Sequence, residues 1–205
     1  LSIVYAVDEF QFKEINTKEG IFTELTAANY TTTNVTGLPA LPLMRQLISV
    51  PLGANVTAKI ITCSSRSINL DEQGVLYPLM PRQESVSKSA NLEQLPFEVN
   101  RDFYNANMWT DNPSISVTEI GMMRGTRIFA VDFVPIKYNP VLKKIEVIYQ
   151  AEVKVAFSGA NFIATNELQA KTYSPAFEGV FAQTLINYDE PKVSFLRYPI
   201  GYVII

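Results

Sequence analysis

Residues 145–157, IEVIYQAEVKVAF, alternate between apolar and polar side chains almost without interruption, and no other stretch of the 205-residue chain constrains its fold as strongly. One side of the stretch carries Ile145, Val147, Tyr149, Ala151, Val153, Val155 and Phe157. The other side carries Glu146, Gln150, Glu152 and Lys154, with Ile148 and Ala156 as exceptions. At ~3.3 Å per residue the stretch predicts a strand of about 43 Å, far longer than the usual five or six residues.

Further strands are predicted on both sides of this ribbon. Alternation recurs at 10–15, 56–60 and 114–121, and Val50-Pro51-Leu52-Gly53 has the residues of a type I turn. Asn139-Pro140 is a turn signal that makes the long strand the second arm of a hairpin. The pattern predicts an all-β fold, an antiparallel two-sheet β-sandwich of the jelly-roll or carbohydrate-module kind.

One short helix is predicted near the C-terminus. Ser174-Pro175 supplies an N-cap and a proline at the first helical position. Phe177, Phe181 and Leu185 then recur every four residues. In contrast, residues 76–113 show no period and contain several prolines, which predicts a long surface excursion.

The composition excludes several function classes. The chain has no histidine and one cysteine, Cys63, which excludes Ser-His-Asp and Cys-His catalysis and the usual zinc sites. We expect Cys63 to be a partly buried, inert thiol. No phosphate-binding loop or dinucleotide motif occurs, so the chain is predicted to be non-catalytic, with no cofactor and no metal. A net charge of −3 without a basic patch argues against a nucleic-acid partner, and no apolar run is long enough for membrane insertion.

Three stretches, in this order, resemble the N-terminal pro-domain of gingipain-type cysteine peptidases. They are GLPALPLMRQLISVPLGANVTAKI, then MMRGTRIFAVDFVPIKYNPVLKKIEVIYQAEVKVAF, and finally SPAFEGVFAQTLINY followed by YPIGYVII. The resemblance covers roughly residues 10–205, and the order and spacing of the stretches make it more specific than any one of them.

The resemblance implies a function and a partner. Pro-domains of this family are β-sandwiches that precede a caspase-like catalytic domain, assist its folding and keep it latent until cleavage. It implies a cognate caspase-like cysteine peptidase domain in cis, and a secreted or cell-surface location in the bacterial periplasm or on the outer surface. Residues 1–197 would form the pro-domain, and 198–205 a linker together with the first strand of a following catalytic domain, GYVII. The alternative for GYVII is a last edge strand of the pro-domain itself.

The resemblance also implies a loop that lies over the active-site cleft, with a basic residue in the specificity pocket of arginine-specific members. The turn Met123-Arg124-Gly125 matches that pattern best, and the alternative is an ordinary solvent-facing turn arginine. Arg82 and Lys88 form a rival inhibitory or cleavage site in the 76–113 excursion. Arg197-Tyr198 is the candidate processing junction, against the alternative of a plain linker arginine.

Two other functions fit a β-sandwich without catalytic residues. One is a carbohydrate-binding or adhesin-like module, in which Trp109, Tyr104 and Phe103 would form a platform for a glycan. The other is a secretion-associated surface protein without a latency role. A glycan-binding test separates the first of these from a pro-domain.

Overall fold

The structure, a computed structural model, describes residues 1–7, 9–86 and 95–189. The strands are β1 (Ser2–Ala6), β2 (Phe10–Thr17), β3 (Gly20–Ala27), β4 (Thr31–Thr32), β5 (Pro42–Val50), β6 (Asn55–Asn69), β7 (Ile115–Met123), β8 (Thr126–Phe133), β9 (Ile136–Asn139) and β10 (Lys144–Ser158). The helices are the 3-10 helix η1 (Asp71–Gln73) and the α-helices α1 (Arg101–Tyr104), α2 (Phe162–Thr172) and α3 (Pro175–Thr184). The strand predicted at 145–157 is confirmed as β10, which has 15 residues.

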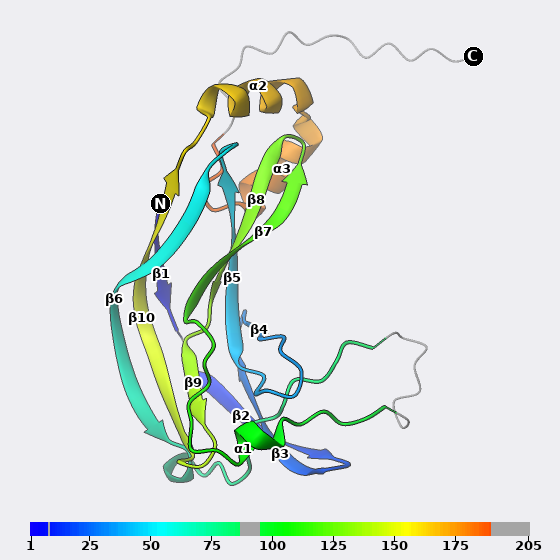
Figure 1. Ribbon diagram of the computed structural model, residues 1–205, viewed down its shortest axis with the longest axis vertical. Coiled ribbons are helices and arrows are strands. Elements are labelled where there is room, and N and C mark those ends of the chain that lie inside the picture. Colours follow the sequence, from blue (N-terminus) through cyan, green and yellow to red (C-terminus); the bar gives the residue numbers. More distant parts are fainter. Residues whose placement is uncertain (8, 87–94, 190–205) are drawn as a thin grey trace, which may run out of the picture. The chain divides into compact units, whose positions relative to one another are not determined.

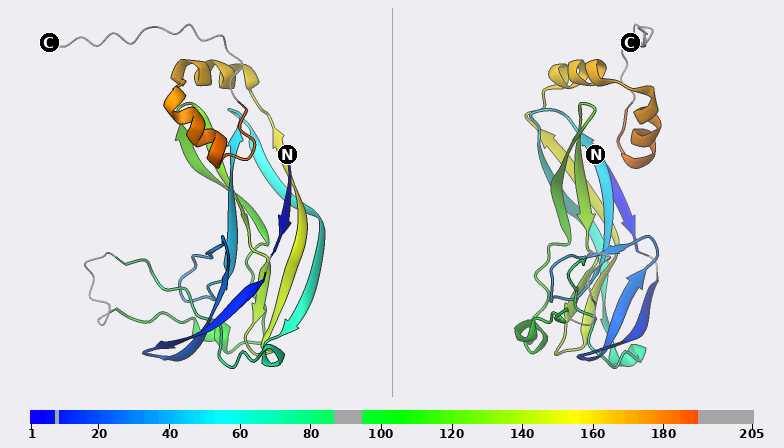
Figure 2. Two further views of the ribbon diagram at one scale, coloured as in Figure 1. Left: turned by 180° about the vertical axis from the view of Figure 1, so that it is seen from behind. Right: turned by 90° about the vertical axis from the view of Figure 1, so that its right-hand side faces the viewer.

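The strands form three sheets (Figure 1). One has the order β1-β10-β6, with β9 also paired to β10, and another has the order β4-β5-β8-β7. The third is the β2-β3 hairpin. Strand β10 pairs antiparallel with β1 and with β9, and Figure 2 shows it between β1 and β6. A mostly β fold with antiparallel sheets is therefore confirmed.

The chain divides into two compact units. The larger unit contains Leu1–Arg45, Thr57–Val117 and Val131–Ala156. The smaller unit contains Gln46–Val56, Thr118–Ala130 and the described residues from Phe157 onward.

Two sheets face each other across the core of the larger unit. Tyr5 of β1 stacks on Phe133 of β8, with ring centroids 4.5 Å apart. The inward side chains of β10 continue this core, and Ile145, Val147 and Val153 are buried as the alternation predicts. Because β1 and β8 belong to different sheets, these contacts make the larger unit a sandwich.

The segment 76–113 was predicted to be a surface excursion, and this prediction is wrong for part of it. Leu79 and Phe103 are buried in the core of the larger unit. The backbone of Thr23 brackets this segment, because its N–H donates to Pro78 and its carbonyl accepts from Met80, both at 2.8 Å. Single apolar residues separated by prolines leave no period in the sequence, although each of them can still fill a place in a core.

Sequence periodicity found α3 and missed the other α-helices. Pro175 takes the first position of α3 as predicted, but the Ser174 side chain makes no capping hydrogen bond. Helix α2 was missed because it lacks a continuous apolar face, and Phe162 and Ile163 at its start are exposed. Its N-cap is Asn161, whose side chain accepts from the N–H of Ala164 at 3.0 Å. None of the helices in the described residues is long and apolar enough to cross a membrane.

Cys63 is exposed, so the prediction of a partly buried thiol is wrong. It lies on β6, an end strand of its sheet, where the residues from Ile61 to Cys63 are exposed on both faces. An apolar flank on an edge strand therefore does not guarantee burial.

Candidate functional site

The turn between β7 and β8 carries the first predicted inhibitory residues. Arg124 and Gly125 both have positive φ, +48° and +72°, as the two central residues of a type I′ hairpin turn require. Met123 packs against the small apolar cluster of the smaller unit, formed by Ile128, Phe181 and Leu185 with their neighbours. Of the three predicted residues, only Arg124 is exposed.

The side chain of Arg124 lies over an aromatic ring of α3. Its guanidinium carbon is 5.0 Å from the ring centroid of Phe177. An exposed cation–π contact of this kind contributes about 0.5–1 kcal/mol. The contact holds the guanidinium only weakly, so it can leave the ring at low cost.

Gly125 anchors the turn against α2. A Cβ added at this position would lie 2.6 Å from Thr172 Oγ1 and 3.0 Å from Leu168 Cγ. The Thr172 hydroxyl is itself held, because it donates to the carbonyl of Leu168 at 2.8 Å. The backbone of the turn therefore lies close to α2, and only the side chain of Arg124 projects from the turn.

An ion pair braces the same hairpin. Arg127 donates to both carboxylate oxygens of Glu119, at 2.7 and 2.8 Å, and to the carbonyl of Ala54 at 2.8 Å. Its guanidinium also lies 4.7 Å from the ring centroid of Phe129. The hydrogen bonds from Arg127 hold the pKa of Glu119 below its usual value. Sequence reasoning passed over this pair because nothing in the local pattern marks it.

Arg82, the rival residue in the larger unit, is half-buried and its backbone is paired on both sides. Its N–H donates to Leu38 at 2.7 Å, and its carbonyl accepts from Gly37 at 2.8 Å. Its side chain donates to the hydroxyl of Thr32 at 3.4 Å. A protease needs unpaired, extended backbone, so this placement disfavours cleavage at Arg82 in the folded protein.

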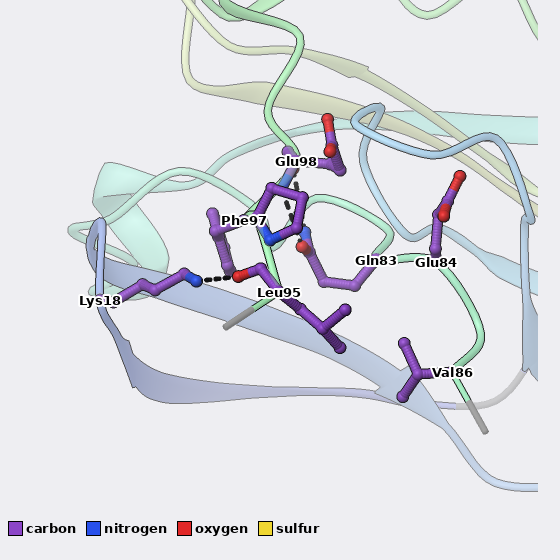
Figure 3. Close-up of a pocket in the computed structure, with 8 residues that line it drawn as sticks. Lys18, Gln83, Glu84, Val86, Leu95, Phe97 and Glu98 are labelled. Carbon is purple, nitrogen blue, oxygen red and sulfur yellow. Dashed lines mark hydrogen bonds between the residues drawn. The ribbon is translucent and has the colours of Figure 1, made fainter. Parts of the chain in front are cut away.

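The side chain of Gln83, just before residues 84–97, is hydrogen-bonded to the backbone of Glu98, just after them (Figure 3). Its side-chain amide donates to the carbonyls of Pro81 and Glu98, at 3.0 and 2.9 Å. Its side-chain oxygen accepts from the N–H of Glu98 at 2.9 Å. Nearby, Lys18 of the β2-β3 hairpin donates to the carbonyl of Leu95. We call the Gln83–Glu98 pairing the neck.

A pocket of about 290 Å³ lies beside the neck. Its described lining combines apolar side chains with two carboxylates and one ammonium group, from Lys18, Glu84, Val86, Leu95, Phe97 and Glu98. Figure 3 shows these side chains around Gln83. In the described part of the chain, no group of three His, Cys, Asp or Glu residues could hold a metal ion.

Comparison with known proteins identifies the kind of domain to which these features belong. The family Propeptide_C25 matches residues 1–195. The chain belongs to this family. It is therefore a gingipain-type pro-domain, a non-catalytic part of a peptidase precursor, and the resemblance found in the sequence is confirmed.

Relatives and solved structures agree with this assignment. The pro-domain is 32% identical to Lys-gingipain HG66 of Porphyromonas gingivalis over 185 residues, 90% of this chain and 11% of that protein. It is 22% identical to gingipain R2 of the same species, over 93% of this chain and 25% of that protein. The chain thus spans about a tenth to a quarter of the length of these relatives.

Two solved structures share the fold. One, which concerns the zymogenic latency of gingipain K from Porphyromonas gingivalis, has a TM-score of 0.72 and 30% identity, and the match covers 78% of this chain and 87% of that one. The other, a complex of the pro- and mature domains of RgpB from the same species, has a TM-score of 0.71 and 20% identity, and covers 92% of each chain.

The remaining predicted residues of the pro-domain lie outside the described residues. These are Lys88, Arg197 and Tyr198, together with the GYVII segment at 201–205. The inhibitory loop, the cleavage site, the processing junction and the boundary at residue 197 therefore stay predictions.

Phe103, Tyr104 and Trp109, the three residues predicted for glycan binding, do not form the flat platform that such binding needs. Phe103 is buried in the core of the larger unit. Its ring stands at 89° to that of Tyr104, whose hydroxyl donates to the carbonyl of Leu79 at 2.7 Å. Trp109 is half-buried. These placements give the carbohydrate-binding alternative no support.

Replacing Arg124 with alanine is expected to leave the pro-domain folded. Arg124→Ala removes one exposed cation–π contact and keeps the same turn, so we expect a loss of at most about 1 kcal/mol in the free energy of unfolding. Chemical denaturation followed by circular dichroism measures this. A loss as large as that caused by truncating a buried core residue would show that Arg124 has a structural role that the contact with Phe177 does not explain.

Proposed function

We propose that this pro-domain keeps the cysteine peptidase domain of its own precursor latent, by covering the active-site cleft until the connection is cut. The observation that carries the proposal is the family match over residues 1–195. The 30% identical solved structure that concerns the zymogenic latency of gingipain K supports it. The partner is then a caspase-like peptidase domain in cis, on the precursor of a secreted or cell-surface protein.

Covalent attachment makes such inhibition effective. A domain joined by a short connection acts at an effective concentration on the order of mM. Even a modest interface then keeps the cleft closed, and cutting the connection allows dilution to separate the domains. The pro-domain therefore needs no catalytic group of its own.

The exposed guanidinium of Arg124 is the first choice for a side chain that enters the specificity pocket. Its guanidinium lies over the ring of Phe177, a weak contact that it can exchange for a carboxylate in a pocket. Met123 packs on the apolar cluster and Gly125 lies close to α2, so these two neighbours position Arg124. Arg82 has both backbone groups paired, so it would have to leave Gly37 and Leu38 first. Lys88 is the remaining rival.

A series of variants decides between these residues. The isolated pro-domain is added to the active peptidase domain of its precursor, as wild type, Arg124→Ala, Arg82→Ala and Lys88→Ala. We expect sub-micromolar inhibition by wild type and a loss of about 100-fold or more in Arg124→Ala, since a buried charged hydrogen-bonded pair contributes several kcal/mol at an interface. If only Lys88→Ala shows this loss, the inhibitory residue is Lys88 and not Arg124.

The same pro-domain is proposed to assist folding of the peptidase domain. Refolding the denatured peptidase domain with and without an equimolar amount of the pro-domain tests this separately from inhibition. A higher yield of enzyme that becomes active after dilution supports assistance. Equal yields with intact inhibition would restrict the function to latency.

A further inference from the structure

The side chain of Arg127 connects three segments of the smaller unit. Its Nε and Nη2 donate to the two carboxylate oxygens of Glu119 on β7, at 2.7 and 2.8 Å, and its Nη1 donates to the carbonyl of Ala54 at 2.8 Å. The guanidinium also lies 4.7 Å from the ring centroid of Phe129, a buried neighbour on β8. Because each nitrogen of the planar guanidinium has its own acceptor, the group is held in one orientation.

Ala54 gives this network a fixed point. It is buried, and it lies in the turn between β5 and β6. The same turn is bonded to the start of α2, since the N–H of Leu52 donates to the Thr165 hydroxyl at 2.9 Å and the carbonyl of Leu52 accepts from the N–H of Asn161 at 2.8 Å. Arg127 therefore joins the β7-β8 hairpin to a turn that is itself bonded to α2.

A second anchor holds the tip of the hairpin, which lies beside α2 and α3 (Figure 1). A Cβ added at Gly125 would be 2.6 Å from Thr172 Oγ1 and 3.1 Å from the carbonyl of Leu168, both near the end of α2. The tip thus contacts the end of α2, while Arg127 joins the arm to the turn at its start. One contact alone would leave the hairpin a pivot, so the second contact sets the direction in which Arg124 is presented.

We propose that Arg127 is a positioning residue for inhibition: its bonds to Glu119 and Ala54 hold the β7-β8 hairpin in the orientation in which Arg124 enters the specificity pocket. This inference rests on the proposed function, in which Arg124 is the residue that enters. A hairpin that is ordered before docking loses little conformational freedom on docking, so it binds more tightly than one that must first be ordered. The donors of Arg127 are used within the pro-domain, and it acts on the peptidase only through Arg124.

The first experiment examines the hairpin without a peptidase. Hydrogen–deuterium exchange followed by mass spectrometry compares the wild-type pro-domain with Arg127→Met, which keeps a long side chain and removes all three hydrogen bonds. We expect amide exchange in the peptides that cover 118–130 to be about tenfold faster in the variant, and exchange in the larger unit to be unchanged. Equal exchange in the hairpin would overturn the proposal.

Lys143→Met is the matched control. Lys143 forms an exposed ion pair with Asp71 at 2.8 Å in the larger unit, so the substitution removes an ion pair that does not belong to the hairpin. We expect both the hairpin exchange and the inhibition constant of this variant to equal those of wild type. An effect as large as that of Arg127→Met would show that losing any ion pair has this consequence, and it would overturn the assignment to Arg127.

The second experiment is a double-mutant cycle on the inhibition constant of the isolated pro-domain against the peptidase domain of its precursor. We expect Arg127→Met to weaken inhibition about tenfold when Arg124 is present, and to have no effect in the Arg124→Ala background, where no side chain is left to position. Equal losses in the two backgrounds would mean that Arg127 contacts the peptidase itself or supports another surface. That result would overturn the proposal.

Arg127→Lys separates the geometry of the guanidinium from its charge. Lysine keeps the positive charge but cannot make the planar, bidentate contact with Glu119 while it also reaches Ala54. We expect a loss of inhibition close to that of Arg127→Met, and wild-type inhibition would overturn the role of the three bonds. If Arg127→Met does not fold, Glu119→Gln replaces it, since it keeps the shape of the side chain and removes its charge and one acceptor.

The two experiments also distinguish this inference from the latency proposal. A wild-type pro-domain that does not inhibit the peptidase domain contradicts latency, whatever the exchange of the hairpin shows. Inhibition by wild type that is unchanged in Arg127→Met, together with faster exchange in its hairpin, contradicts only the positioning role of Arg127.

Discussion

Raising the pH above 10 is expected to unfold the protein steeply, because three tyrosines of the larger unit resist ionisation while it is folded. Burial raises the pKa of Tyr138 to about 12. Burial also raises the pKa of Tyr104, and it raises the pKa of Tyr5 with a smaller contribution from the nearby carboxylate of Asp132. The folded state therefore keeps protons that the unfolded chain releases near pH 10.

Proton binding sets the direction of this pH dependence of stability. A group whose pKa is raised in the folded state stabilises that state fully at pH values below its unfolded-state pKa. This stabilisation is lost as the pH rises through its folded-state pKa. Each such group changes the free energy of unfolding by about 1.4 kcal/mol per pH unit in that window. Together the three groups lower the free energy of unfolding by about 4 kcal/mol per pH unit above pH 10. A protein of ordinary stability is therefore expected to unfold within one or two pH units.

Equilibrium urea unfolding measures this slope at a series of pH values from about 8 to 11, a range that spans the ordinary pKa of tyrosine. Tyr5→Phe is the matched control, since the Tyr5 hydroxyl has no hydrogen-bond partner among the described residues and its loss removes only the ionisable group. We expect this variant to match wild type at neutral pH and to lose about a third of the alkaline slope. A wild-type stability that stays flat to pH 11 would contradict the burial of these hydroxyls.

Gly125→Ala is expected to destabilise the smaller unit by about 2–4 kcal/mol. The new methyl group would lie 2.6 Å from Thr172 Oγ1 and 3.1 Å from the backbone carbonyl of Leu168, so either α2 or the turn must move. The positive φ of +72° adds the strain of a left-handed conformation in a residue with a Cβ. Thermal unfolding followed by circular dichroism measures the loss.

Gly74 separates the two causes. Its φ of +73° is nearly the same, but a Cβ added there meets nothing within 4 Å. Gly74→Ala should therefore cost only the conformational strain, about 1–2 kcal/mol. Equal losses in the two variants would mean that the contact between Gly125 and α2 does not constrain the turn. Gly125→Ala is also expected to weaken inhibition, because it displaces Arg124.

The sequence predicts the parts of this fold that rest on local periodicity. Strand β10 alternates almost without interruption, so most of its buried side chains could be assigned from the sequence, although Tyr149 on the apolar side is exposed. The turn at Arg124-Gly125 was also predicted, because a glycine beside the arginine permits a turn that presents the side chain outward. Helix α3 followed from the spacing of Phe177, Phe181 and Leu185, all of which pack in one cluster.

Contacts between distant residues were not predictable in the same way. Nothing near Arg124 in the sequence indicates that Phe177 will lie beside it, since the two are brought together only when α3 packs on the hairpin. The neck depends on Gln83 and Glu98, two polar residues in a stretch without periodicity. Helix α2 has one buried residue, Thr165, so its amphipathic signal is too weak to detect.

The central claim is latency, and the most direct test measures the activity of the precursor as a function of dilution. In the intact precursor the inhibitor is attached, so activity on a small peptide substrate should be low and independent of concentration. After the connection between the two domains is cut, activity should rise as the mixture is diluted and the pro-domain separates. An intact precursor that is as active as the free peptidase domain would contradict the account.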